Sequence, residues 1–162
     1  MKTSKKTIVC SLVLLIFLLL IGGVVKDFHS AIMKKTRYEG VMGIAIALKV
    51  YSHDYDTYLP PLDKWCDKLI EKADCGAGSF VGWIDREEGK CGYALNENLA
   101  GLKFDELDDK VVLAFEAKGK WNLSGGINLA RNTKQKDIAV VLVDGYMDFV
   151  KPEDIDKLKW EP

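Results

Sequence analysis

An uninterrupted apolar run near the N-terminus constrains this chain more than any other feature. Residues 8–25 read IVCSLVLLIFLLLIGGVV, contain no charged side chain, and are followed by Lys26. A helix of that length rises about 27 Å, close to the thickness of the hydrocarbon core of a bilayer. The run therefore predicts a transmembrane helix. A cleaved secretory signal is the alternative, but its apolar core usually spans about 7–15 residues and precedes a small-x-small cleavage site, which is absent here.

Charge is distributed unevenly along the chain. The total is nearly balanced, with 23 Lys and Arg against 24 Asp and Glu, but up to Arg37 there are seven basic residues and one acidic residue. A balanced total offers no basic excess to neutralise phosphates, so the composition argues against a dedicated nucleic-acid-binding protein. Basic residues stand on both sides of the apolar run, and charge alone therefore leaves its orientation undecided.

Residues 30–55 predict an amphipathic helix that continues from the apolar run. Apolar side chains recur at intervals of three and four residues, which places them on one helix face. This face, which we expect to pack against the rest of the domain, comprises Val41, Ile44, Leu48 and Tyr51. The helix should end before Pro60, because the residue before a proline is disfavoured in the helical conformation. A second short helix is predicted over residues 62–72, and a glycine-rich loop over residues 73–90.

The C-terminal half predicts β-strands. Short apolar runs occupy residues 111–116, 138–143 and 146–150, and a proline-initiated helical turn follows over residues 152–158. Asp144 and Gly145 separate the last two runs, which predicts a hairpin with a type I′ turn. The fold class expected is therefore α+β, with a long N-terminal helix packed on a small antiparallel sheet.

Residues suited to catalysis or to metal binding are sparse. The two histidines, His29 and His53, have no convincing catalytic partner nearby in the sequence, and no glycine-rich phosphate-binding motif is present. Carboxylates cluster at residues 105–109 and 153–154, which makes a calcium site worth considering. The first cluster lacks the alternating oxygen ligands and the central glycine of a calcium loop. We therefore expect neither an enzyme nor a protein with a cofactor.

Cysteine spacing suggests one disulfide. Cys75 and Cys91 flank a connection whose closure by a disulfide would stabilise the fold by roughly 3 kcal/mol, and such bonds favour an exported domain. Cys66 would then have no disulfide partner. Free thiols are an alternative, whereas zinc is disfavoured because these cysteines have neither close-pair spacing nor a nearby histidine.

Several blocks of sequence resemble those of pseudopilin-like proteins of bacterial type II secretion and type IV pilus systems. The blocks are residues 43–61, 91–101, 111–126 and 140–150, and their order is similar to that in the prepilin-type family named for a His, nine residues and then Asp-Gly. Two departures are visible. Lys134 stands where the family has its histidine, and the apolar run lacks the glycine and the glutamate of the prepilin cleavage motif.

The resemblance implies a pilin-like structural or assembly protein without catalysis. It implies residues 1–7 as a basic cytoplasmic end, residues 8–25 as the membrane anchor, residues 26–56 as the amphipathic continuation and residues 57–162 as an extracytoplasmic globular region. The location expected is thus the cytoplasmic membrane, crossed once with the N-terminus inside and the domain periplasmic or extracellular. Expected partners are the membrane, other pilin-like subunits and a secretion or pilus assembly, but not nucleic acid.

A ligand-binding module is the alternative function. Such a module would be exported, remain tethered or be released by signal cleavage, and hold a glycan or a peptide on its loops. Tryptophan side chains provide stacking surfaces for such ligands. The loops considered carry Trp83, Trp121, Gly125 and Gly126.

Overall fold

The computed structural model describes residues 5–81 and 89–162, with side chains from residue 22 onward. The chain divides into two compact units, residues 1–35 and residues 36–162. Helix α1 spans Lys5–Asp54, and its C-terminal part, from Thr36, belongs to the second unit. The sequence predicted a globular region that begins at residue 57. The compact unit begins earlier because this part of α1 contributes to its hydrophobic core.

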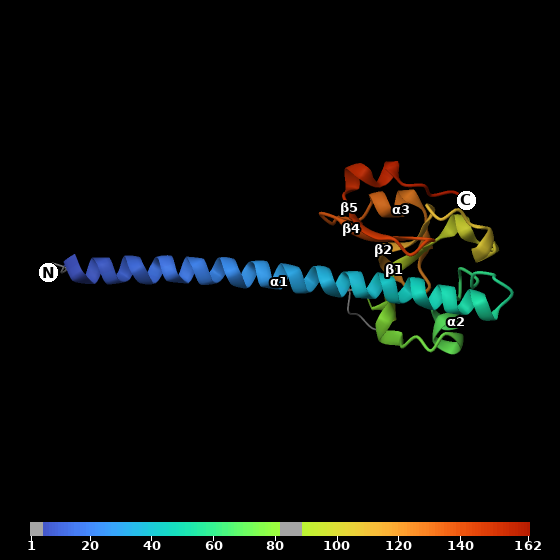
Figure 1. Ribbon diagram of the computed structural model, residues 1–162, viewed down its shortest axis with the longest axis horizontal. Coiled ribbons are helices and arrows are strands. Elements are labelled where there is room, and N and C mark those ends of the chain that lie inside the picture. The colour runs from blue at the N-terminus through green and yellow to red at the C-terminus, as the bar shows by residue number, and fades with distance from the viewer. Residues whose placement is uncertain (1–4, 82–88) are drawn as a thin grey trace. The chain divides into compact units, whose positions relative to one another are not determined.

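The second unit contains one five-stranded sheet in the order β3-β1-β2-β4-β5 (Figure 1). Neighbouring strands are antiparallel, except that β3 runs parallel to β1. The strands are β1 (Lys90–Asn96), β2 (Val112–Lys120), β3 (Ser124–Gly125), β4 (Ile138–Leu142) and β5 (Met147–Val150). The remaining helices are α2 (Trp65–Lys72), α3 (Ile127–Arg131) and the 3₁₀ helices η1 (Ala77–Phe80), η2 (Glu97–Leu99), η3 (Phe104–Glu106) and η4 (Pro152–Lys157). The mixed class of helix and sheet is as predicted.

Both faces of the central strand are covered. Consecutive residues of β2 from Val112 to Ala117 are all buried, which requires packing above and below because alternate side chains of a strand point to opposite faces. On one face, the ring of Phe115 contacts that of Trp160 edge-on, with centroids 5.1 Å apart. Figure 1 shows α3 and η4 on the face opposite to α1. The core therefore lies in two layers, one on each side of β2.

The amphipathic part of α1 supplies one wall of this core. Val41, Ile44, Leu48 and Tyr51 are all buried and belong to the same hydrophobic cluster as the strand residues. Ile46 and Val50, which fall on the other side of the helix, are exposed. The spacing of three and four residues thus separates a buried helix face from an exposed one.

The hairpin predicted at Asp144 and Gly145 is present, but its turn differs from the prediction. Strands β4 and β5 pair antiparallel, and Leu142 donates its backbone N–H to the carbonyl of Tyr146 at 2.9 Å. A type I′ turn needs positive φ at two residues, whereas only Gly145 has one here, at 86°. The Asp144 carboxylate instead accepts the N–H of Tyr146 at 2.7 Å, which stabilises a longer connection.

Gly145→Ala is expected to destabilise the second unit modestly. No atom would meet an alanine Cβ within 4 Å, so the substitution tests backbone strain alone. A left-handed conformation costs an L-residue roughly 1–2 kcal/mol, and the free energy of unfolding should fall by about 1 kcal/mol. Urea denaturation measures this fall. Gly78→Ala is the matched control, because Gly78 also has open space and has no positive φ. Equal effects of the two substitutions would contradict the strain argument.

The predicted membrane location is corrected. Residues 8–25 lie within α1, but the side chains of residues 5–21 fall outside the described part of the chain. Among the described residues, no helix combines the length and the apolar character needed to cross a bilayer. From Gly22 onward the cause is charge, since Lys26 and Asp27 interrupt the apolar sequence of α1 and ionised side chains are costly in hydrocarbon. On this finding the prediction of a single-pass protein of the cytoplasmic membrane is wrong.

Candidate functional site: the junction of α1 and the sheet

A charged side chain fixes α1 to the sheet. Arg37, at the start of the second unit, reaches Glu116 of β2 across 79 positions of sequence. Its Nε donates to one carboxylate oxygen at 2.9 Å, and its Nη2 donates to the other at 2.6 Å. This forked geometry is the strongest arrangement available to an Arg–carboxylate pair. The contact therefore links the part of α1 that belongs to the second unit to β2.

Glu116 is completely buried, and both of its carboxylate oxygens accept hydrogen bonds. Besides Arg37, the backbone N–H of Ala139 on β4 donates to Oε2 at 2.8 Å. A buried carboxylate is tolerated only when it is paired and hydrogen-bonded, because removing an ionised group from water is expensive. The network meets that requirement and joins α1, β2 and β4 at one point.

Two further contacts complete the surroundings of Arg37. Its Nη1 donates to the Asp137 carboxylate at 2.7 Å, and its Nη2 donates to the Asp137 carbonyl at 2.8 Å. The guanidinium also lies over the Phe149 ring of β5, 4.8 Å from the centroid. Burial lowers the pKa of Arg37, but the hydrogen bonds and charges of Glu116 and Asp137 outweigh it and leave the pKa above its ordinary value. The side chain is a permanent cation.

A close approach of backbone to side chain lies beside this ion pair. Tyr93 of β1 is the cross-strand neighbour of Glu116, and its hydroxyl meets α1 at Gly40. A Cβ at position 40 would overlap that hydroxyl and would lie 2.9 Å from Cζ. Burial, followed by the charges of Glu116 and Cys91, raises the pKa of Tyr93 well above its ordinary value. Tyr93 is therefore a neutral phenol that fills the space left by a glycine.

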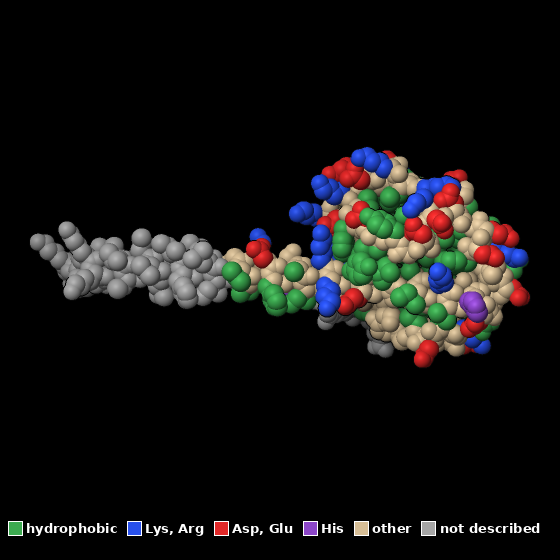
Figure 2. All heavy atoms as spheres, viewed as in Figure 1, with side chains coloured by type: hydrophobic (Ala, Val, Ile, Leu, Met, Phe, Trp, Pro, Cys, Tyr) green, Lys and Arg blue, Asp and Glu red, His purple; other side chains and the backbone are tan. Residues whose placement is uncertain are grey.

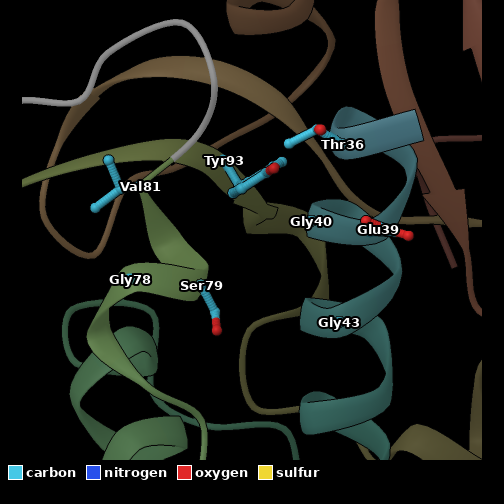
Figure 3. A pocket seen from close by; sticks show the side chains of 8 residues that line it. All are labelled: Thr36, Glu39, Gly40, Gly43, Gly78, Ser79, Val81 and Tyr93. Carbon is cyan, nitrogen blue, oxygen red and sulfur yellow. The ribbon is translucent and has the colours of Figure 1, made fainter. Parts of the chain in front are cut away.

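A pocket opens next to this contact. Its volume is about 290 Å³, and Figure 3 shows α1 as one wall and η1 with the adjoining chain as the other. The α1 wall is low because Gly40 and Gly43 have no side chain. The pocket offers hydroxyls and one carboxylate, which can form hydrogen bonds. Its lining residues are Thr36, Glu39, Gly40, Gly43, Gly78, Ser79, Val81 and Tyr93.

The structure rearranges the predicted cysteine pair. Cys66, Cys75 and Cys91 are all free thiols here; Cys75 is half-buried, whereas Cys91 lies beside Cys66, with their Sγ atoms 3.9 Å apart. The predicted Cys75–Cys91 bond is therefore absent, and the cysteine expected to be left over is the neighbour of Cys91. Sequence spacing misled because α2 turns the Cys66 side chain inward, while Cys75 lies beyond the end of that helix.

The acidic runs considered for calcium have other partners. Asp108 accepts a hydrogen bond from the backbone N–H of Lys110 at 2.8 Å and pairs with Lys159 at 2.9 Å. Asp154 pairs with Lys157 at 2.6 Å. In the part of the chain that the structure describes, no group of three or more His, Cys, Asp or Glu side chains is arranged to hold a metal ion. These observations do not test whether calcium binds, so the expectation of no cofactor stays a prediction.

The loops of the alternative ligand-binding module are mostly packed into the domain. The Trp121 indole donates to Asp67 at 2.7 Å, and its ring contacts Phe80 edge-on. A Cβ at Gly125 would collide with Leu129. Trp83 lies outside the described residues. Lys134, at the position of the family histidine, lines a second pocket of about 340 Å³ together with Lys118, Leu129, Asn132, Thr133 and Gln135.

Comparison with known proteins yields no match to a family model, to a curated protein or to a solved structure. The observations define a fold class alone: a mixed unit of helices and one sheet, in which Arg37 of α1 is paired with Glu116 of β2. Membership of the pilin-like family stays a prediction from the resemblance.

Sequence reasoning did not single out the residues of the junction. Arg37 reads as one more basic residue after the apolar run, and Glu116 reads as the end of a strand. One signal was available, because Glu116 follows five apolar residues and precedes Ala117. A lone carboxylate inside a buried strand requires a cationic partner, although the sequence does not say which one.

Proposed function

We propose that this chain is a pilin-like structural or assembly protein that acts by packing against further copies of itself, without catalysis. The observation that carries the proposal is a row of exposed apolar side chains on α1. In the first unit, Val24 and Phe28 are four residues apart and are 69% and 67% exposed. Residues four apart share a helix face. Figure 2 shows apolar side chains on the surface of this segment.

The second unit has a similar feature on its own part of α1. Ile46 and Val50, again four residues apart, are exposed on the side of the helix opposite to the buried face that includes Leu48. Adjacent exposed apolar side chains of this size favour association, because each Å² of apolar surface that is removed from water contributes about 25 cal/mol of favourable free energy. A helix face of this kind fits another helix through ridges and grooves.

Charge favours a second copy as the partner. Residues 1–35 contain six basic residues and one acidic residue, whereas residues 36–162 contain 17 basic and 23 acidic residues. The first unit of one copy therefore complements the second unit of another electrostatically. Contacts between unlike surfaces are heterologous, and they generate open filaments when the rotation does not close a ring. The resemblance to pilin-like proteins implies other pilin-like subunits as partners.

Phe28→Asp is expected to weaken self-association of the full chain at least tenfold. The substitution places a charge in the centre of the apolar row, where it must be desolvated on association. Sedimentation velocity over a concentration series measures the association constant. Ser30→Asp is the matched control, since it adds the same charge two residues away on another side of the helix, and it should change association less than twofold.

Two results would contradict this proposal. One is a wild-type chain that stays monomeric at every concentration tested. The other is an equal effect of Phe28→Asp and Ser30→Asp, because the apolar row would then not be the surface that associates. The expected dependence on salt adds a further check, since screening of complementary charges should weaken the assembly as ionic strength rises.

A further inference from the structure

Two buried thiols meet where α2 packs against β1. The Sγ atoms of Cys66 and Cys91 are 3.9 Å apart, and both residues are completely buried. That separation is van der Waals contact between two sulfur atoms. A disulfide has a sulfur–sulfur distance of about 2.05 Å, so each sulfur must move by roughly 1 Å to form one. A movement of that size lies within the range of small side-chain rotations.

The surrounding contacts hold both cysteines in place. The backbone N–H of Cys66 donates to the Asn122 side chain at 2.8 Å, and the preceding Trp65 indole donates to the Leu123 carbonyl at 2.9 Å. On the other side, the register of β1 with β2 shifts between Cys91 and Tyr93. Such bulges re-aim side chains. Contacts with Asn122 and Leu123 hold the Cys66 side, and the bulge in β1 orients the Cys91 side, so that the two thiols face each other.

We propose that Cys66 and Cys91 form a disulfide that covalently links α2 to β1. The two residues are 25 positions apart, so the bond closes a loop that contains α2, η1 and the segment leading to β1. Cys75, which lies within that loop and is half-buried, remains a free thiol. The inference is independent of the proposed assembly function.

The oxidation requires a disulfide oxidant. The Cys91 thiolate attacks one sulfur of that oxidant, which expels one thiol and leaves a mixed disulfide on Cys91. Cys66, after loss of its proton, then attacks the Cys91 sulfur and expels the second thiol. Two protein thiols are oxidised and one small disulfide is reduced to two thiols, so the two electrons and two protons balance.

The electrostatics of the pair fit this order of events. Burial, reinforced by Cys91, raises the pKa of Cys66. The hydrogen bond from Cys66 lowers the pKa of Cys91 and outweighs the opposing effect of burial. The Cys91 sulfur is therefore the one that ionises first. Because both sulfurs are buried, the reaction proceeds during local opening of α2, and the finished bond then opposes that opening.

Peptide mapping of the wild-type chain tests the proposal directly. The purified full chain is incubated with oxidised glutathione, denatured, alkylated with iodoacetamide and digested with trypsin. Cleavage after lysine and arginine places each of the three cysteines of the second unit in its own peptide: residues 65–68 for Cys66, 73–86 for Cys75 and 91–103 for Cys91. We expect the first and third peptides to be joined by a bond that reductant breaks, and the second to be alkylated.

Stability provides the second readout. Closing a loop of this size should lower the unfolding equilibrium constant by two to three orders of magnitude, roughly, and reductant should reverse this shift. Cys66→Ala and Cys91→Ala should each abolish the reductant-dependent shift, whereas Cys75→Ala, the matched control, should retain it. The mapping of the wild-type chain decides the question even if one of the variants fails to fold.

Three outcomes would overturn the proposal. In the first, all three peptides are alkylated after oxidation. In the second, Cys75 is joined to Cys91 or to Cys66. In the third, the bond joins two copies of the chain, which mixing of ¹⁵N-labelled and unlabelled chains before oxidation would reveal as hybrid cross-linked peptides. A single joined pair of peptides 65–68 and 91–103 within one chain supports it.

Discussion

Replacing Arg37 with methionine is expected to lower the free energy of unfolding of the second unit by about 3–5 kcal/mol. Methionine keeps the length and the apolar contacts of the stem but removes every charged donor. Of the described donors to the completely buried Glu116 carboxylate, the N–H of Ala139 then remains. An uncompensated buried charge accounts for most of the loss. Chemical denaturation, followed by tryptophan fluorescence, measures it.

The matched control is Arg131→Met. Arg131 also pairs with a carboxylate, that of Asp156 at 2.7 Å, but both side chains are largely exposed. Exposed pairs are screened by water and contribute little. The control should therefore leave stability almost unchanged. Similar losses in the two variants would show that the effect comes from general charge removal and not from the buried junction.

A double variant separates the cost of leaving the Glu116 charge unpaired from the cost of losing the packing of the Arg37 side chain. Glu116→Gln keeps the shape of the side chain and an oxygen that can accept the N–H of Ala139, but it removes the negative charge. Combined with Arg37→Met, it should recover at least half of the stability lost in the single variant, because no buried charge remains. No recovery would assign the loss to the cation's packing on Phe149 instead.

The parts of the fold that could be predicted are those set by local sequence. The spacing of Val41, Ile44 and Leu48 defines a helix face regardless of what covers it. The Asp144-Gly145 pair between two apolar runs indicates a hairpin, although it did not give the turn type, because the Asp144 side chain competes for the backbone of Tyr146. Each of these signals lies within about ten residues.

The junction could not be predicted because its determinants are far apart. Nothing near Arg37 indicates that its partner is Glu116, and nothing near Cys91 favours Cys66 over Cys75. Strand β1 was missed because its sequence, with Gly92 between Cys91 and Tyr93, lacks the alternation of a half-buried strand. Its residues are buried on both sides of a bulge, and only tertiary packing specifies that arrangement.

Gly40→Ala is expected to destabilise the second unit by about 2 kcal/mol, although alanine is the better helix former. The new Cβ would overlap the Tyr93 hydroxyl and approach Cζ to 2.9 Å. The ring is buried, so we expect an overpacking cost near the upper end of the usual range, about 3 kcal/mol. The higher helix propensity of alanine offsets about 1 kcal/mol of this overpacking cost. Thermal and chemical denaturation measure the net loss.

Gly43→Ala provides a control of opposite sign. Gly43 lies one turn further along α1, and no atom would meet its Cβ within 4 Å, so only the helix preference changes. This variant should gain about 1 kcal/mol. Adding Tyr93→Phe to Gly40→Ala removes the oxygen that the new Cβ overlaps and should restore part of the lost stability. If Gly40→Ala were as stable as Gly43→Ala, α1 would not lie against β1 at Gly40.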